Sequence, residues 1–305
     1  MDNIQKNLLE KIADLHKTPE GAYNIRANGT LGGRNTTANI DIVSKIDKSG
    51  IDIVIKPNTK GESVHIPVII SQSGLTELVY NDFYVGEGAD VVIVAGCGIH
   101  NTGDEKSQHD GIHTFHVGKG AKVKYVERHY GEGDGNGENI MNPTTVIEID
   151  EDGYLEMETT QIKGVDSTDR VTTAKLAKGA KIVVKEKLMT HGSQFAKTEF
   201  TVDLDGEDSG ANIISRSVAK DNSRQIFKSV INGNNKCTGH TECDAIIMDD
   251  AKVVAIPEIT ANHIDAALIH EAAIGKIAGE QIIKLMTLGL TEQEAEEQIV
   301  SGFLK

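Results

Sequence analysis

Short runs in which apolar and polar residues alternate cover most of the chain. Residues 40–43 (IDIV) and 51–55 (IDIVI) alternate partly with aspartate, and residues 64–70 (VHIPVII) form a longer apolar run. These segments are rich in Val and Ile, whose branched side chains fit the pleated surface of a sheet. The pattern therefore predicts many short strands between about residues 38 and 275.

At the two ends of the chain, apolar residues recur at helical spacing instead. Near the start, apolar residues at helical spacing predict an amphipathic helix over residues 2–17: Ile4, Leu8, Ile12 and Leu15. Near the other end, residues 278–289 predict a helix that Gly289 closes. Residues 291–303 predict a second helix, which begins with the capping box TEQE. Together these two helices would form a hairpin, which either caps an open end of the strand region or docks another protein.

A glycine-containing unit recurs through the strand region. Each copy consists of glycine, alanine, any residue and a branched Val or Ile. Copies begin at Gly88, Gly120, Gly179 and Gly210, and a looser copy begins at Gly153. The spacings between successive glycines are 32, 33, 26 and 31 residues. A period of this size without helical stretches predicts a β-solenoid, in which stacked coils bury a continuous apolar core. A β-sandwich is the alternative, because it also has short strands and turns.

The predicted organisation has three parts. Residues 1–37 would form the N-terminal helix and a connection, residues 38–275 the solenoid core, and residues 276–305 the C-terminal helical hairpin. The glycine-rich segment 131–139 (GEGDGNGEN) would interrupt the core as an exposed flexible loop. Its carboxylates fit neither the EF-hand spacing nor the nonapeptide repeat of calcium-binding solenoids.

Composition and charge narrow the possible functions. The net charge of −15 argues against binding to nucleic acid or to an anionic membrane, because both depend on clustered Lys and Arg. Three cysteines are too few for a disulfide framework and favour a reducing compartment. No apolar run is long enough to span a bilayer or resembles a signal peptide. We therefore expect a soluble cytoplasmic protein.

Most of the candidate chemistry lies between Cys237 and Glu271. Cys237, His240 and Cys243 form a C-x2-H-x2-C pattern, but no second Cys/His pair follows at zinc-finger spacing. The alternative is a polar turn before a buried strand. A second group of histidines follows Cys97, and alternation along a strand would scatter them over two faces: His100, His109, His113 and His116.

Several motifs resemble the SufB/SufD family of iron–sulfur cluster assembly proteins. The resemblance covers roughly residues 60–305. It is most specific in the last third, with HEAA at 270–273, GKI at 275–277, EQ at 280–281, LM at 285–286, GLTEQEA at 289–295 and GF at 302–303. Upstream, TECD at 241–244 resembles the cysteine segment of SufB. Gly96-Cys97, His109 and GAKVKY at 120–125 resemble an earlier SufB segment.

The resemblance implies a right-handed parallel β-helix with helical termini that acts as a scaffold for iron–sulfur cluster assembly. It implies a transiently bound cluster, a Suf-type ABC ATPase bound by the C-terminal helices, and sulfur-donor and recipient proteins as further partners. By correspondence, Cys243 is the main ligand, with His270 and Glu271 assisting, and Cys97 is linked to sulfur transfer. Cys237 and His240 are not part of the SufB pattern.

Adjacent residues on a strand face opposite sides, so His270 and Glu271 should not both reach one cluster within one chain. A homodimer, or a pair with a SufD-like subunit, resolves this if Cys243 and Glu271 of one chain meet His270 of the other. Two other functions compete with a scaffold that has no enzymatic activity of its own. One is a purely structural, SufD-like subunit, against which Cys243 argues. The other is a solenoid enzyme acting on polysaccharides, against which the absence of Trp argues.

Overall fold

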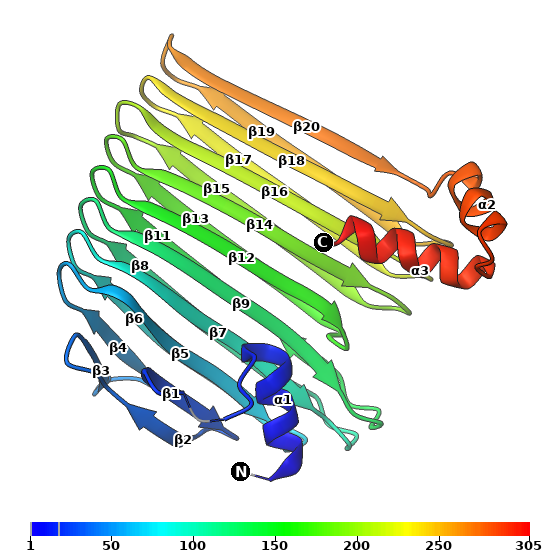
Figure 1. Ribbon diagram of the computed structural model, residues 1–305, viewed down its shortest axis with the longest axis horizontal. Helices are drawn as coiled ribbons and strands as arrows, with labels where there is room; N and C mark the ends of the chain where they lie inside the picture. The colour runs from blue at the N-terminus through cyan, green and yellow to red at the C-terminus, as the bar shows by residue number, and fades with distance from the viewer. Residues whose placement is uncertain (1, 18) are drawn as a thin grey trace.

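Successive strands alternate between two sheets that face each other, so the chain winds into a solenoid. The computed structural model describes residues 2–17 and 19–305 (Figure 1). It shows a parallel β-solenoid of about eight turns with short helices at both ends. The predicted solenoid is confirmed. A sandwich of antiparallel sheets is excluded, because the neighbouring strands of successive coils run parallel.

The strands fall into two sheets of ten. Sheet A has the order β2 (Thr30–Asn35), β1 (Ala22–Ala27), β5 (Lys60–Ile70), β7 (Asp90–His100), β9 (Lys122–Glu132), β12 (Tyr154–Lys163), β14 (Lys181–Thr190), β16 (Ser209–Ala219), β18 (Cys237–Ile247) and β20 (Ala266–Gly275). Sheet B has the order β19 (Lys252–Ala261), β17 (Arg224–Gly233), β15 (Phe195–Leu204), β13 (Ser167–Leu176), β10 (Asn139–Met141), β8 (Ser107–Val117), β6 (Thr76–Val85), β4 (Gly50–Ile55) and β3 (Ile40–Ser44). β11 (Thr144–Ile149) continues β10 between β8 and β13.

The first coil begins earlier than predicted. β1 pairs with β5 in parallel and with β2 in an antiparallel hairpin, so sheet A begins at Ala22 rather than near residue 38. The β1–β2 turn places Asn28 and Gly29 in the left-handed region, at φ of 48° and 75°. Asn and Gly tolerate this conformation best, and the turn therefore folds locally.

The recurring unit corresponds to the turn that precedes the strands of sheet A. One residue of that turn is left-handed in six successive coils, with φ between 56° and 67°: Asn58, Gly88, Gly120, Asp152, Gly179 and Asp208. Asp152 and Asp208 therefore occupy the turn position that the sequence pattern assigned to Gly153 and Gly210. The predicted start of the unit was one residue too late at Gly153 and two residues too late at Gly210, because Asp can replace Gly in a left-handed turn.

The glycine-rich segment after β9 is not a loose loop. Backbone N–H groups of Gly135 and Gly137 donate to the carbonyls of Asn101 and Gly103 in the preceding coil, at 3.2 and 2.9 Å. A Cβ added at either glycine would collide with that backbone. Glycine is needed here for close approach of two backbones, which corrects the prediction of a flexible loop.

The N-terminal helix packs on the outer face of sheet A. Helix α1 (Asn3–Ala13) starts at a capping box with Asp2 and ends at left-handed Asp14, and is thus shorter than the predicted 2–17. Its buried residues Leu8 and Ile12 lie over β7, where Gly96 and Gly98 leave room for them. Figure 1 shows α1 crossing the early strands of the sheet.

The C-terminal hairpin does not cover the end of the solenoid. Helices α2 (Gly279–Thr287) and α3 (Glu292–Phe303) lie beside the last coils (Figure 1), and Lys187 of β14 donates to the Lys305 carbonyl. The last strands, β19 and β20, remain at an open end with exposed apolar side chains, among them Ile256 and Ile269. The interpretation of the hairpin as an end cap is therefore wrong.

The interior of the solenoid is mostly aliphatic, but a buried polar network joins its two sheets near β9. The carboxylate of Glu127 accepts hydrogen bonds from Arg170 of β13 and from the Tyr125 hydroxyl, the latter at 3.1 Å. The same hydroxyl lies 2.7 Å from Nδ1 of His113. Burial alone would raise the pKa of Glu127, but Arg170 and His129 hold it well below its usual range.

We predict that Arg170→Met lowers the free energy of unfolding by about 3–5 kcal/mol, because Glu127 keeps its buried charge without a partner. Lys197→Met is the matched control. Lys197 pairs with Asp169 at 3.2 Å on the surface, and its loss should cost under about 1 kcal/mol. Urea unfolding followed by circular dichroism measures both. Equal effects of the two substitutions would contradict a structural role for the buried pair.

The buried histidines predict loss of stability in mild acid. Desolvation lowers the pKa of His109 to about 3 and that of His113 to about 4. An unfolded histidine binds its proton near pH 6.5, so between pH 6.5 and 4 the unfolded state carries more protons. Stability is then complete above pH 6.5 and falls on acidification, by roughly 2 kcal/mol per histidine at pH 5.

The variant His109→Gln should reduce the slope of the unfolding free energy against pH by the equivalent of about one proton. This holds even if its free energy of unfolding at pH 8 is lower. His16→Gln changes an exposed histidine and should leave the slope as it is. Unfolding curves at pH 8, 6.5 and 5 measure the slope. An unaltered slope in His109→Gln would show that its protonation does not limit stability.

Candidate functional site

The thiol of Cys243 lies inside the solenoid near its open end. Cys243 is 1% exposed and stands in register between Ser215 of β16 and Ala272 of β20. Desolvation, with smaller contributions from Glu186 and Asp244, raises the pKa of the thiol to about 12. The thiol is therefore protonated at neutral pH, and a metal that binds it must displace the proton.

His270 faces the same interior wall as Cys243. It pairs with Thr241 in the ladder, so its side chain projects on the side shared by residues 241 and 243. Its Nδ1 is buried and has no hydrogen-bond partner, and desolvation lowers the pKa of the ring. An imidazole whose Nδ1 has no partner is thus a diagonal neighbour of a buried thiol, on the last two strands of sheet A.

Glu271 lies on the opposite, outer wall. It is in register with Glu242, and its carboxylate lies 3.6 Å from Nε2 of His240. The structure therefore separates the predicted trio, because Cys243 and His270 share one face and Glu271 occupies the other. As expected, His270 and Glu271 point to opposite faces of β20. Cys243 and Glu271, which the hypothesis places together at one cluster, also point to opposite faces of the sheet.

Cys97 is buried far from Cys243. It lies on β7, five strand positions along sheet A from β18, which corresponds to about 24 Å at ~4.8 Å per strand. Burial raises the pKa of the Cys97 thiol, as do the nearby carboxylates of Glu77 and Glu127. These two cysteines cannot hold one cluster together within a single chain.

Cys237 does not complete a metal site with its neighbours. Cys237 and Cys243 both belong to the interior apolar cluster, whereas His240 projects outward between them. Residues three apart on a strand face opposite sides, so the histidine of the C-x2-H-x2-C pattern points away from its two cysteines. The three side chains therefore cannot bind one metal ion. The alternative of a polar turn before a buried strand is only partly right, because β18 begins at Cys237 itself and the expected turn is part of the strand.

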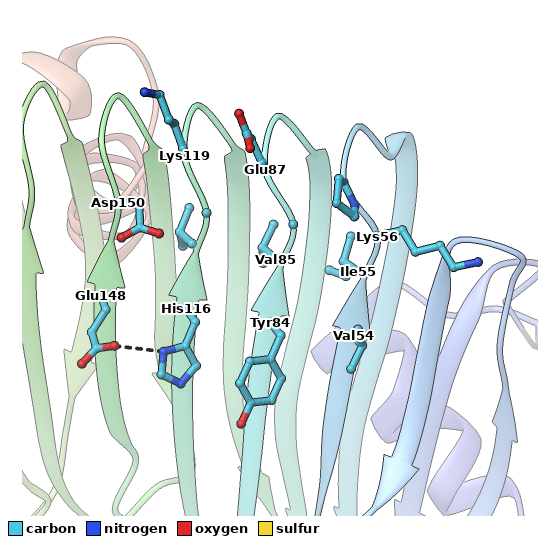
Figure 2. Close-up of a pocket in the computed structure, with 14 residues that line it drawn as sticks. Val54, Ile55, Lys56, Tyr84, Val85, Glu87, His116, Lys119, Glu148 and Asp150 are labelled. Carbon is cyan, nitrogen blue, oxygen red and sulfur yellow. Dashed lines mark hydrogen bonds and ion pairs between the residues drawn. The ribbon is translucent and has the colours of Figure 1, made fainter.

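The histidines after Cys97 divide between the two faces of β8 as predicted. His109 and His113 point inward and His116 points outward. His116 takes part in a row on the outer face of sheet B, with Tyr84 stacked on it at 5.0 Å between ring centroids and Glu148 bound at 2.9 Å (Figure 2). This row lines an open groove of about 580 Å³, which lies away from the cysteines.

Sequence reasoning missed the polar residues that line the interior between the two cysteines. Glu186 accepts hydrogen bonds from Thr198 and from Ser215, at 2.8 and 2.6 Å, and Ser215 is the ladder neighbour of Cys243. Glu186 and Ser215 stand 29 residues, about one coil, apart in sequence, whereas Thr198 follows Glu186 by 12 residues on the facing sheet. Polar residues do recur in the sequence at the length of one coil, but this recurrence can be recognised only when the register between coils is known.

Comparison with known protein families gives one match over most of the chain. The family model described as SUF system FeS cluster assembly, SufBD core domain, matches residues 70–303. Within the described residues, no helix is long and apolar enough to cross a membrane.

Several curated relatives carry the same family name. An iron–sulfur cluster assembly SufBD family protein of Methanocaldococcus jannaschii is 30% identical over 255 residues, which are 83% of this chain and 79% of the relative. One from Archaeoglobus fulgidus is 30% identical, covering 80% of this chain and 66% of the relative. One from Methanothermobacter thermautotrophicus is 29% identical, covering 78% of this chain but only 57% of the relative.

The match to the family model spans well over half of the chain, and it includes both Cys97 and the last strands with Cys243 and His270. The relatives agree in name and cover most of this chain. The chain therefore belongs to the SufBD family of iron–sulfur cluster assembly proteins.

Proposed function

We propose that this chain is a scaffold on which an iron–sulfur cluster is assembled, with the Cys243 thiol as its main ligand. One observation carries the proposal: a buried thiol and an imidazole with an unpartnered Nδ1 face the same wall on the last two strands of sheet A, at the open end of the solenoid. Thiolate and imidazole are both known ligands of iron–sulfur clusters. A cluster held by so few ligands is a cargo that can be passed on to recipient proteins.

A second chain would supply the missing ligands. One chain offers Cys243 and His270, whereas clusters are usually held by four protein ligands. The open end with β19 and β20 has exposed apolar side chains and unpaired strand edges, which suit pairing with a copy of itself or with a SufD-like subunit. Glu271 would reach a cluster only across such an interface, because its own chain turns it away from Cys243.

The helical hairpin would dock the Suf-type ABC ATPase. Ile283, Met286 and Leu288 are 62%, 43% and 80% exposed on and after α2, although they are large and apolar. An exposed apolar strip on a helix that rests beside the solenoid is available to a partner. Leu285 is less exposed, so the partner-facing residues are these three rather than Leu285.

Cys97 would take part in sulfur transfer rather than in holding the cluster, since it lies about 24 Å from Cys243 by strand spacing. The proposal also includes a sulfur donor and recipient proteins as partners, and a cytoplasmic location. In it the chain has no catalytic residues of its own, and ATP hydrolysis belongs to the partner. A purely structural, SufD-like role is the competing function, and it assigns no task to a buried thiol beside an imidazole whose Nδ1 has no partner.

We predict that Cys243→Ser abolishes cluster formation on anaerobic reconstitution with iron and sulfide, read as loss of the thiolate-to-iron absorption band. The hydroxyl cannot replace a thiolate as a cluster ligand. Cys237→Ser is the matched control, because it changes a buried cysteine on the same strand. His270→Ala should reduce the yield. A full-yield cluster in Cys243→Ser, or equal loss in both cysteine variants, would refute the assignment.

We predict that Met286→Glu together with Ile283→Glu weakens co-purification with the Suf-type ATPase by at least tenfold. Charges on an apolar contact strip remove its burial energy and leave carboxylates unpaired. Glu296→Lys, a surface change on the other helix, is the control. Circular dichroism verifies that the solenoid and the helices persist. Undiminished co-purification of the double variant would place the ATPase elsewhere.

A further inference from the structure

We propose a second metal site, on the outer wall of sheet A, in which His240, Glu242 and Glu271 bind a divalent first-row transition metal ion. Their ligand atoms all lie within 4.8 Å of one another. The trio is the only group of three such side chains this close among residues 2–17 and 19–305. This site uses neither Cys243 nor His270, and it shares only Glu271 with the proposed cluster ligands.

The register of the solenoid brings the three ligands together. His240 and Glu242 are two residues apart on β18, so they share its outer face. Glu271 stands directly beside Glu242 on the neighbouring strand β20. Two positions on one strand and one on the next form a triangle on a single face, which is a natural arrangement for three ligands.

A fourth residue fixes the imidazole for metal binding. The side-chain oxygen of Asn212 on β16 lies 3.0 Å from Nδ1 of His240 and accepts a hydrogen bond from it. With Nδ1 held in this way, Nε2 faces the carboxylate of Glu271 at 3.6 Å. A metal ion between them would be bound by both, and a ligating histidine held through its other nitrogen is the usual design of metal sites.

The charge around the trio also favours a cation. Glu242, Asp244 and Glu271 contribute three carboxylates to this part of the wall, and Arg216 is the basic residue paired with them, 3.9 Å from Glu242. Burial and the neighbouring Asp244 raise the pKa of Glu242, as expected for crowded carboxyl groups. A divalent ion would relieve this crowding while Arg216 orients Glu242 from the side.

The ligand set indicates the class of metal. One imidazole and two carboxylates without thiolate suit Mn²⁺, Fe²⁺ and Zn²⁺, whereas Cu⁺ prefers sulfur and Ca²⁺ prefers an all-oxygen shell. The Glu271 side chain is 67% exposed and that of His240 33%. Water therefore completes the coordination, which makes the bound ion open to exchange.

The test is a titration of the metal-free full-length chain with Mn²⁺, followed by electron paramagnetic resonance. Mn²⁺ has little affinity for thiols, so the cysteines contribute little. We expect one Mn²⁺ per chain, with binding at least tenfold weaker in His240→Ala and in Glu242→Gln. Asn212→Ala should weaken binding about tenfold by releasing the ring. Cys243→Ser should bind as the unaltered chain does.

His116→Ala is the matched control, because His116 is also an outward histidine beside a glutamate, Glu148, at 2.9 Å. It should not change the titration. X-ray absorption of Cys243→Ser loaded with one Zn²⁺ per chain should show only nitrogen and oxygen ligands, including one imidazole. Equal binding in His240→Ala and the unaltered chain, or sulfur among the zinc ligands, would overturn the site. Neither result bears on cluster formation by Cys243, which is measured separately.

Discussion

Alternation of side chains across a single strand is the constraint on which the chemistry of this solenoid depends. Each residue is committed to the interior or to the outer wall, and parallel stacking in register repeats that commitment in the next coil. Cys243 and His270 therefore meet on the inside, while His240 and Glu271 meet on the outside. Ligands that are adjacent in sequence are separated by the backbone, and ligands about one coil apart become neighbours.

The same constraint explains how far the sequence alone could lead. The strand-rich core, the terminal helices and the two faces of β8 follow from local periodicity, which is visible in a single segment. Register between coils is not local: Asp152 and Asp208 replaced glycine in the turns, and the apparent repeat slipped by one residue in one coil and by two in the other. The position of Glu271 relative to Cys243, and the trio around His240, depend on that register and could not be predicted from motif spacing.

The interior shows how a solenoid holds charged groups at low cost. Glu127 and Arg170 come from opposite sheets and meet across the interior. Glu186 accepts from Thr198 on the facing sheet and from Ser215 on the neighbouring strand of its own sheet. These two buried carboxylates are thus paired by a neighbouring or facing strand, which is the condition under which burial is tolerated. The thiols of Cys97 and Cys243 lie in this interior with raised pKa values. Reactions at either one require a metal or another group that removes the proton.

The placement of both sites at the last strand follows from the physics of an open end. β20 pairs on one side only, with β18, so its other edge is unpaired. An edge strand is held by fewer contacts than an interior one, and the groups it carries can adjust to a ligand. His270 and Glu271 are consecutive on this strand and face opposite walls. The backbone that turns one of them toward the interior turns the other to the outside, which keeps the inner thiol and imidazole apart from the outer trio on one strand.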